Sequence, residues 1–384
     1  MQAALLNKSP DCGLRICCIS PSYLPRVGGG EKYAHRLNAA LVRRGIAVHV
    51  LTSVPNCRGR RVQDGVSIEY ARALHLVGFP WFNPAALLRT IREQRPHAVI
   101  AYGPSPYDPI VAIILRLLRI PFLQIYHADF NDRGPATRVV TWLHNLVALR
   151  LASAIICTNQ RMLLALERRG FVSRTIAATP GVDDIFFSKA PLETTRERAL
   201  LFVGALDEGH KYKRLDILLT AVSELRRDGG TVILRVVGDG NRRVHFEELT
   251  KEMGLTGCVE FLGGIGDADL ALQYAASSAL VLPSPTTQEG FGLVCLEAMA
   301  AGLPVVCSQN AGAAQIVRDA PAGALWDGAN IDDLKIAIVK AKSATPKERA
   351  ELRMYARAYD WDAMCEQLLT DLATLLPQIS LRDR

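Results

Sequence analysis

Short apolar runs, typical of buried strands, alternate with amphipathic helical stretches along most of the chain. The first run covers residues 14–20. A glycine-rich loop, a helical stretch over 31–44 and a second strand over 47–52 follow it. A strand–helix–strand unit of this kind pairs its strands in parallel and covers the sheet with helices. Residues 66–70 are a candidate extra strand, and the other predicted strands span residues 97–103, 121–128, 153–158, 175–181, 199–206, 231–238, 258–263, 279–284 and 304–308. The sequence therefore predicts an α/β fold.

The alternation is interrupted at one place, the polar segment 182–198 (VDDIFFSKAPLETTRER). A chain of 384 residues is long enough for two domains with separate cores. We therefore expect two Rossmann-like domains, residues 1–181 and 199–360, joined by a linker over 182–198. Residues 361–384 are predicted to form a C-terminal helix that crosses back to the N-terminal domain, with Trp361 as its docking point. Sheets of this type bind ligands at the carboxyl ends of their strands, so we expect the site there.

Charge is distributed unevenly between the two halves of the chain. Residues 1–190 hold 24 of the 45 Lys and Arg residues but only 11 of the 38 Asp and Glu residues. Nucleic acid and acidic lipid both fit such a basic half, and scattered solvated charge is the ordinary alternative. No helix-turn-helix, zinc-finger or RNP-like pattern supports nucleic acid. We expect no nucleic-acid partner, and we treat an anionic membrane surface as a candidate partner of the basic half.

The sequence also argues against several other classes of protein. The nine cysteines lie in apolar contexts such as RICCIS and LVCLEA, which is typical of buried thiols in a cytosolic protein. No paired C-x-x-C spacing indicates a zinc site. The first residues reach Lys8, Pro10 and Asp11 too early for a secretory signal. No apolar run reaches the roughly 18 residues that a spanning helix needs. We expect a cytoplasmic protein.

The segment 288–298 (QEGFGLVCLEA) is the strongest candidate for a binding site. The apolar run 279–284 precedes it, and a helix is predicted from Gly292 onward. A buried strand thus leads through a glycine-bearing loop to a helix N-terminus, whose N–H groups and dipole favour an anion. Glu289 precedes the helix and Glu297 lies about one and a half turns into it. We interpret the two carboxylates as separate hydrogen-bond acceptors around one elongated, partly anionic ligand.

Several motifs, taken together in their order, carry a resemblance to a known family. They are GGGE (28–31), HKYKRLDILLTA (210–221), VGDG (237–240), FLGGI (261–265) and EGFGLVCLEAMAAGLPVV with its E-x7-E pair. Together they resemble the large family 4 of retaining glycosyltransferases, which has a two-Rossmann (GT-B) architecture. The resemblance covers the chain from about Leu14 to Trp361. It implies that the C-terminal domain holds a nucleotide-sugar donor and that the N-terminal domain holds the acceptor.

The resemblance implies a role for individual residues. Glu289 would hold hydroxyls of the donor sugar, Lys213 would neutralise the departing diphosphate, and His127 would lie near the sugar; these three are the catalytic candidates. Glu297 would accept hydrogen bonds from the ribose hydroxyls. The other implied donor contacts come from the backbone or from close approach of the chain, at Gly29, Gly30, Gly238, Gly263, Ile265, Phe291, Gly292 and Leu293.

The diphosphate needs fixed positive charge when the bond to the sugar breaks. Lys213 and the helix N-terminus at Gly292 can supply that charge, so no metal or other cofactor is expected. The family often carries an arginine where this chain has Ala205. His210 and Arg214 are the candidates for a replacement diphosphate clamp, with Lys211 between them.

Two further motifs point to other chemistry, and both have a simpler explanation. Asp267 and Asp269 spell D-x-D, which holds a metal in other glycosyltransferases. Here they open a predicted helix, so an N-cap followed by a first-turn acid explains them better. The GDG of 238–240 lacks the G-x-G-x-x-G spacing of a nicotinamide dinucleotide site.

Each candidate residue also has an ordinary structural explanation. Lys213 could begin an amphipathic surface helix, and Glu289 could interact with a helix dipole. His127 could be a structural histidine, and the glycines at 28–30 could form only a tight turn. Glu297 has apolar neighbours, where an acid normally has a partner.

We therefore expect a retaining hexosyltransferase that uses a nucleoside-diphosphate sugar, GDP-mannose or a UDP-hexose. The acceptor would be a hydroxyl of a saccharide or lipid-linked saccharide, in polysaccharide or glycolipid synthesis. The alternatives are a nucleotide-sugar epimerase or phosphorylase on the same fold, and a non-catalytic nucleotide-sugar-binding subunit. Trp81, Phe82 and the apolar face of residues 138–150 are candidates for peripheral contact with the inner face of the membrane. A core-facing helix is the alternative for 138–150.

Overall fold

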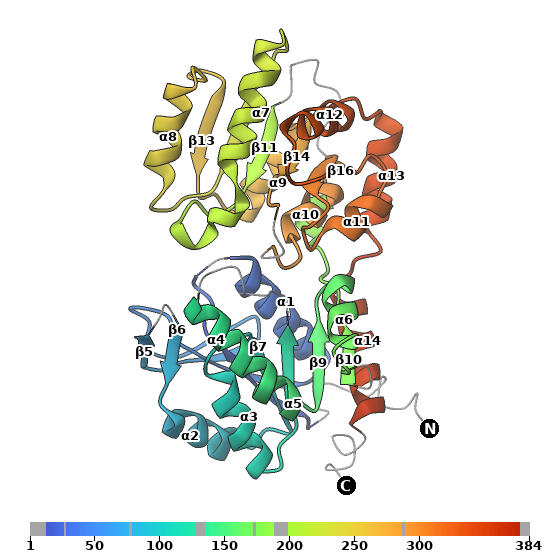
Figure 1. Cartoon of the computed structure of the whole chain (residues 1–384). Helices are drawn as coiled ribbons and strands as arrows, with labels where there is room; N and C mark the ends of the chain where they lie inside the picture. The colour runs from blue at the N-terminus through green and yellow to red at the C-terminus, as the bar shows by residue number, and fades with distance from the viewer. Residues whose placement is uncertain are drawn as a thin grey trace. The chain divides into compact units, whose positions relative to one another are not determined.

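The computed structural model of the chain describes residues 13–26, 28–76, 79–126, 135–171, 174–187, 199–285 and 289–376. The chain divides into two compact units, which Figure 1 colours by position along the sequence. The first unit comprises Met1–Pro180 together with Trp361–Arg384, and the second unit comprises Gly181–Asp360.

The first unit is built on an eight-stranded sheet. Its strands are β1 (Arg15–Ser20), β2 (Ala47–Thr52), β3 (Gly59–Gln63), β4 (Val66–Tyr70), β7 (Ala98–Gly103), β8 (Phe122–Tyr126), β9 (Ala154–Cys157) and β10 (Thr175–Ala177). Their order is β10-β9-β8-β7-β1-β2-β4-β3. The neighbours pair in parallel except for β3, which runs antiparallel beside β4 at the edge. A separate hairpin pairs β5 (Ala73–Leu76) with β6 (Phe79–Phe82).

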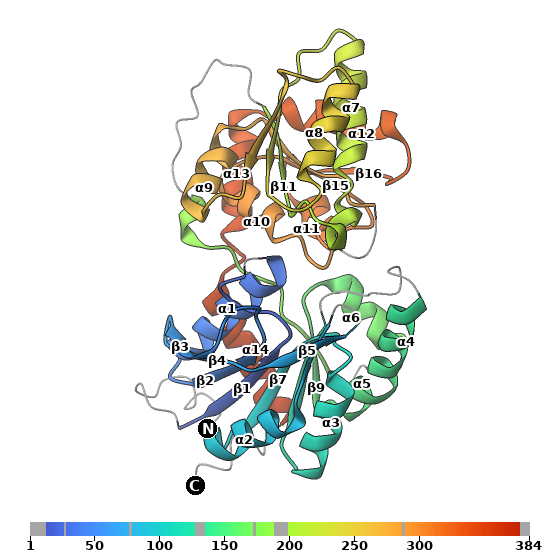
Figure 2. The same cartoon turned by 90° about the vertical axis from the view of Figure 1, so that its left-hand side faces the viewer.

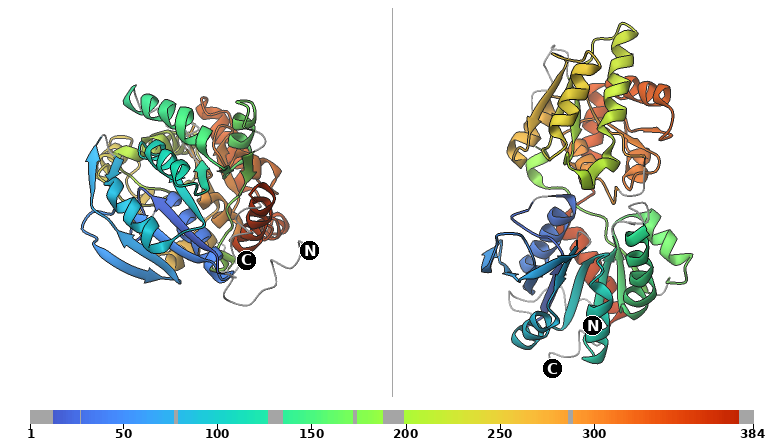
Figure 3. Two further views of the ribbon diagram at one scale, coloured as in Figure 1. Left: turned by 90° about the horizontal axis from the view of Figure 1, so that it is seen from below. Right: turned by 60° about the vertical axis from the view of Figure 1, so that its left-hand side comes forward.

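Helices cover both faces of this sheet (Figure 2). They are α1 (Gly29–Arg43), α2 (Pro84–Gln94), α3 (Asp108–Leu117), α4 (Pro135–Leu143), the π-helical segment η3 (His144–Ala148), α5 (Leu149–Leu151), α6 (Gln160–Glu167) and α14 (Trp361–Leu375). The C-terminal helix α14 packs against α1 (Figure 3). The rings of Trp361 and Tyr33 meet edge to face there, with centroids 5.7 Å apart. The helix α14 thus packs on the first unit, although it follows the second unit in the sequence.

The second unit has a six-stranded parallel sheet. Its strands are β11 (Leu200–Val203), β12 (Leu234–Val237), β13 (Val259–Gly263), β14 (Ala279–Leu282), β15 (Val305–Ser308) and β16 (Ala324–Trp326). They lie in the order β13-β12-β11-β14-β15-β16. The chain first adds strands on one side of β11 and then continues on the other side with β14. The gap between the loops that follow β11 and β14 is therefore the topological switch point, where doubly wound sheets bind ligands.

The core of the second unit lies in two layers, one on each face of the sheet. Its helices are η5 (Asp184–Phe187) and η6 (Glu208–Lys213), both of 3-10 type, and α7 (Leu215–Arg227), α8 (Arg243–Glu252), α9 (Asp267–Ala276), α10 (Leu293–Ala300), α11 (Ala314–Asp319), α12 (Ile331–Lys342) and α13 (Pro346–Ala356). Leu200 and Phe202 pack with α7, α8 and α12, and the alternate residues Leu201 and Val203 pack with α9, α10, α11 and α13. Successive strand residues point to opposite faces, so a continuous apolar run can fill both layers.

The α/β fold with two parallel sheets confirms the prediction from the sequence. Some local predictions are wrong. Helix α1 begins at Gly29, so Gly29 and Gly30 form its first turn instead of a loop. The N-cap of α9 is Gly266, so both Asp267 and Asp269 lie inside the first turn, where acids favour the helix dipole.

Candidate active site

The second unit brings Lys213 and Glu289 together at its switch point. Lys213 is the last residue of η6, which follows β11, and Glu289 lies in the loop after β14. The Lys213 Nζ donates a hydrogen bond of 2.7 Å to Glu289 Oε2. The two side chains are 11% and 10% exposed, respectively. Two catalytic candidates from distant parts of the sequence thus form one nearly buried ion pair.

The ion pair keeps the Lys213 ammonium charged in a place where water is scarce. Burial by itself would lower the pKa of Lys213, because it disfavours the charged form. The charge and hydrogen bond of Glu289 outweigh burial, so the pKa of Lys213 lies above its usual value. An ammonium has three N–H donors, and Glu289 accepts from Lys213 through one oxygen. Lys213 is therefore a fixed cation with donor capacity left for an anionic ligand.

Glycines hold the loops around this cation in close contact. A side chain on Gly204, directly after β11, would place its Cβ 2.5 Å from Lys213 Cδ. Gly238, after β12, has a φ of 137° and packs against the Gly204 carbonyl, so only glycine fits there. The Gly238 N–H donates to the Gly263 carbonyl oxygen at 2.8 Å. The predicted donor contacts Gly238 and Gly263 thus lie in adjacent loops at the carboxyl ends of their strands, and Ile265 follows, packed against the core.

The loop that carries Glu289 is fixed from two sides. Gly292 is the N-cap of α10 with φ 75° and ψ 59°, and a Cβ there would stand 3.3 Å from Leu282 Cδ2. The N–H of Gly312 donates to the Glu289 carbonyl oxygen at 3.0 Å. Phe291 is buried in the core, and Leu293 is the first residue of α10. The predicted loop contacts Phe291, Gly292 and Leu293 therefore form a rigid turn that leads to a helix N-terminus.

Glu297 is buried inside α10 and already has a protein partner. Its Oε2 accepts a 2.9 Å hydrogen bond from the Tyr274 hydroxyl on α9. Burial, and to a smaller extent the nearby charge of Glu297, raises the pKa of Tyr274 well above its usual value. The phenol therefore stays protonated and donates its hydrogen bond to Glu297. This contact explains how an acid can lie among apolar neighbours. The role of Glu297 toward a ribose stays a prediction.

The residues predicted to replace the arginine missing at position 205 are engaged with nearby carboxylates. His210 Nδ1 lies 2.6 Å from Asp207 Oδ1, Lys211 pairs with Glu208, and Arg214 contacts both oxygens of Asp216 at 2.8–3.0 Å. Their part in a diphosphate clamp stays a prediction.

Sequence reasoning missed another cation, Arg242. Arg242 lines the same small pocket as Ala205 and Lys213. Its guanidinium lies 4.8 Å above the Phe246 ring and 3.5 Å from Glu208, and its side chain is mostly buried. The sequence does show a basic pair here, Arg242 and Arg243, which follows the GDG of 238–240 after one asparagine.

The remaining predicted residues lie in the first unit or outside the described residues. Gly29 and Gly30 form the first turn of α1 after the N-cap Gly28, and a Cβ on Gly29 would meet no other atom within 4 Å. His127 lies outside the described residues. Contacts of these three residues with a donor stay predictions.

The described residues contain no group of three or more His, Cys, Asp or Glu side chains that could hold a metal ion. Asp267 and Asp269 open α9 as first-turn acids. None of the helices in the described ranges is long and apolar enough to cross a membrane.

Two α/β units in series, one with a glycine-lined switch point and an E-x7-E pair that runs from a loop into a helix, are the features of a glycosyltransferase with the GT-B fold. The sequence profile of Glycosyltransferase Family 4 matches residues 27–184, and that of Glycosyl transferases group 1 matches residues 183–359. The chain belongs to this family of GT-B glycosyltransferases, family 4.

Individual relatives agree with this assignment. The chain is 28% identical over 377 residues to a GDP-mannose-dependent alpha-(1-6)-phosphatidylinositol monomannoside mannosyltransferase of Mycobacterium tuberculosis, covering 90% of this chain and 93% of the relative. Sucrose-phosphate synthase from Thermosynechococcus elongatus has the same fold, with a TM-score of 0.78 and 21% identity over 95% of this chain and all of that one. Anabaena Alr3699/HepE in complex with UDP-glucose gives a TM-score of 0.73 and 20% identity, over 94% of this chain and all of that one.

Proposed function

We propose that this glycosyltransferase transfers a hexose, with retention of configuration and without a metal, from a nucleoside-diphosphate sugar to a hydroxyl of a saccharide or lipid-linked saccharide. One observation carries the proposal. A nearly buried ammonium, Lys213, is held by Glu289 at the switch point of the second unit, next to the N-terminus of α10. This arrangement suits a ligand that combines a diphosphate with a sugar.

The chemistry follows from where charge develops. When the bond between the sugar and the diphosphate breaks, negative charge grows on the leaving group, and a fixed cation stabilises that state more than the ground state. Lys213 supplies the cation, and the positive end of the α10 dipole adds to it. Glu289 keeps Lys213 in place, and its other oxygen is an acceptor for a sugar hydroxyl. No carboxylate stands out as a covalent nucleophile, so we infer that the acceptor attacks from the face that the diphosphate leaves.

Two classes of donor are candidates. The mycobacterial relative is named for its dependence on GDP-mannose, and Alr3699/HepE was solved with UDP-glucose. A thermal-shift panel of GDP, UDP and ADP separates the bases, because a ligand that binds only the folded state raises the midpoint according to its affinity. We expect one nucleotide to raise the midpoint clearly more than the others.

A pair of matched variants makes this panel a test of the site. Lys213→Met should abolish the shift, and Lys251→Met, which removes an exposed lysine on α8, should leave it intact. Equal shifts in both variants would refute the assignment of Lys213 to the diphosphate. A shift with none of the three nucleotides in the unchanged protein would argue against a nucleotide-sugar donor.

We further infer peripheral contact with an anionic membrane, through a surface of the first unit that we call the apolar face. It is formed by exposed side chains of α3 and of the α4–η3 segment, which lie side by side (Figures 1 and 2). Its members are Ile113, Leu117, Leu118, Val139, Trp142, Leu143 and Leu146. Exposed large apolar side chains on neighbouring segments are typical of a contact with a lipid or protein partner.

The charges around the apolar face favour lipid. Arg116 on α3, Arg119 just after α3 and Arg150 just after η3 are exposed. Apart from the buried Asp108, the described residues of 108–119 and 135–150 include no acid. An apolar helix face rimmed by arginine suits the headgroup region of an anionic bilayer. The alternative that 138–150 forms a core-facing helix holds for one side of the segment, where Thr141, His144, Ala148 and Leu149 are buried. On its other side Val139, Trp142, Leu143 and Leu146 are exposed. The side chains of Trp81 and Phe82 lie outside the described parts of the chain.

A further inference from the structure

A pocket of about 730 Å³ opens on the first unit, and none of the candidate site residues described so far lines it. It lies where β3, β4 and the N-terminal half of α2 meet, and Tyr70, the last residue of β4, pairs there with Gly59 of β3. The pocket therefore lies at the carboxyl end of a parallel strand, on the edge where α/β sheets bind ligands. Its volume falls in the range of about 300–1,000 Å³ that is typical of small-molecule sites.

Arginines dominate the lining of this pocket. Four of them, Arg58, Arg60, Arg72 and Arg89, face two glutamates, Glu69 and Glu93. They come from three separate parts of the fold. Arg58 and Arg60 lie just before and within β3, Arg72 follows β4, and Arg89 lies on α2. Arginines that converge from different elements on one pocket indicate a site for an anion.

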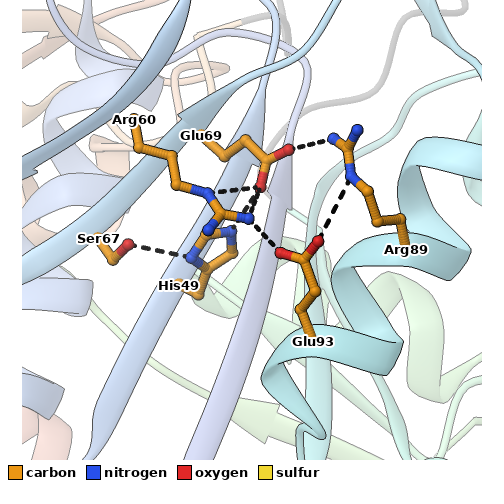
Figure 4. Close-up of polar contacts among 6 residues, drawn as sticks. All are labelled: His49, Arg60, Ser67, Glu69, Arg89 and Glu93. Atoms are coloured by element: carbon orange, nitrogen blue, oxygen red, sulfur yellow. Dashed lines mark hydrogen bonds and ion pairs between the residues drawn. The ribbon is translucent and has the colours of Figure 1, made fainter.

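The buried carboxylate of Glu69 organises two of these arginines, as Figure 4 shows. Glu69 Oε2 accepts hydrogen bonds from Arg60 at 3.2 and 3.3 Å, and Oε1 accepts from Arg89. Glu93 makes a second contact with Arg60 and lies 3.9 Å from Arg89 Nε. The glutamates thus fix the orientation of two guanidiniums, and this reduces the entropy that a ligand would otherwise lose in ordering them.

His49 completes the base of this cluster without adding charge. Its Nε2 lies 3.4 Å from Glu69 Oε2, and its Nδ1 lies 3.1 Å from Ser67 Oγ. Burial lowers the pKa of His49 below its usual value despite the nearby Glu69. The imidazole is therefore neutral near pH 7, and the balance of charge in the pocket is set by the arginines and glutamates.

Positive charge is left over after these contacts. In the described part of the chain Arg58 and Arg72 have no carboxylate partner, and no contact engages Nη1 of Arg60 or Arg89. Helix α2 also begins at the pocket, with Asn83 as its N-cap, and contributes the positive end of its dipole. The pocket as a whole therefore favours a ligand with about two negative charges.

We propose that this pocket binds the phosphate of a phosphorylated sugar or other polyol, and that this group belongs to the acceptor. Guanidiniums match phosphate oxygens through two parallel hydrogen bonds, and a phosphate monoester carries nearly two charges at pH 7. The pocket is larger than a bare phosphate needs, and the half-exposed Glu93 is an acceptor for hydroxyls of an attached ring. The assignment to the acceptor rests on the proposed function. The anion site itself rests only on the first unit.

Calorimetric titration of the full chain with inorganic phosphate and with glucose 6-phosphate, without nucleotide and at constant ionic strength, tests the proposal. Vesicles of phosphatidylcholine with and without phosphatidylinositol give the lipid arm of the test. The test variant is Arg58→Gln with Arg72→Gln, two exposed changes that leave the Glu69 cluster intact. The matched control is Arg92→Gln, an exposed arginine of α2 that does not line the pocket.

We expect the double variant to bind the phosphate probe about tenfold or more weakly, because each lost hydrogen bond to a charged group is worth a factor of this order. Arg92→Gln should bind like the unchanged protein. Binding of glucose 6-phosphate would identify a free sugar phosphate, and binding only of phosphatidylinositol vesicles would identify a lipid headgroup. Either result supports the proposal if the double variant loses it.

The proposal is overturned if the double variant binds every probe as well as the unchanged protein, if Arg92→Gln weakens binding equally, or if the unchanged protein binds no probe. Nucleotide binding by the double variant is measured in parallel and should be unchanged. Loss of the anion site and failure of the proposed donor site are therefore separate results.

Discussion

The ion pair between Lys213 and Glu289 permits a quantitative prediction. The two side chains are 11% and 10% exposed and their charged atoms are 2.7 Å apart. We consider Lys213→Met, Glu289→Gln and the double variant, which together form a double-mutant cycle. Each single change removes one charge and leaves the other in a nearly buried place without its partner.

Breaking a buried pair from one side typically costs about 3–5 kcal/mol, because an uncompensated charge stays behind. Because both side chains retain slight exposure, we expect each single variant to lose about 3 kcal/mol of unfolding free energy. A 1 kcal/mol change shifts the thermal midpoint by about 2–4 °C in a domain of this size, so each midpoint should fall by about 6–12 °C. The double variant removes both charges and should lose only about 1 kcal/mol, which gives a coupling energy of about 5 kcal/mol.

The pH dependence follows from the direction of the pKa shift. The pKa of Lys213 is higher in the folded state, so its contribution to stability is fully present below the unfolded pKa of about 10.4 and is lost as the pH rises through the folded value. The difference in the free energy of unfolding between Lys213→Met and the unchanged protein should therefore stay constant from about pH 6 to 9.

Thermal and urea denaturation of the four proteins measure the cycle, and the exposed Lys251→Met is the control for a general loss of charge. The reasoning is refuted if the loss of unfolding free energy in the double variant equals the sum of the two single losses to within about 0.5 kcal/mol, because independent sites are additive in this way. The two residues would then not form a buried pair in solution.

Two further predictions concern the other cation and the apolar face. Arg242→Gln should weaken binding of the preferred nucleoside diphosphate by about tenfold but leave binding of the free nucleoside unchanged, because the lost guanidinium would bind phosphate and not the base. The control is Arg227→Gln, an exposed change on α7. An equal loss of nucleoside binding in Arg242→Gln would contradict this role. Leu117→Glu and Trp142→Ser should each weaken flotation with phosphatidylcholine–phosphatidylserine vesicles by about tenfold or more, because a buried large apolar side chain is worth about 1.5–3 kcal/mol. The matched change Val244→Glu on α8 should have no effect on flotation, and full binding by both test variants would rule out the apolar face as the membrane contact.

The strands were the most predictable part of the fold. β2 and β4 begin and end at the predicted residues. Strand β3 (GRRVQ) was not predicted. Its polar, mostly exposed residues pair only along one edge, so the strand has no apolar pattern that would distinguish it from a loop.

The site was predictable in its parts but not in its contacts. The glycine-bearing loop between a strand and a helix indicated Gly292, and the family resemblance implied Gly238 and Gly263. The contact between Lys213 and Glu289 depends on the strand order that places β11 beside β14, and sequence spacing carries no information about that order. The arginine pocket likewise depends on the antiparallel pairing of β3. The excess of positive charge in the first half indicated an anionic partner without locating it.

A carboxylate organises the cations at both sites, but the net charge that results is different. In the second unit one glutamate neutralises one lysine, so the Lys213–Glu289 pair by itself attracts no anion from solution. The α10 N-terminus and Arg242 therefore supply the net attraction of a diphosphate to this acidic half of the chain. The remaining N–H donors of Lys213 hold the bound diphosphate and stabilise the charge that develops on it as the leaving group. In the first unit four arginines exceed two glutamates, so the pocket can bind an anion in its ground state. The first arrangement therefore suits a reacting phosphate, and the second suits a phosphate that only has to be held.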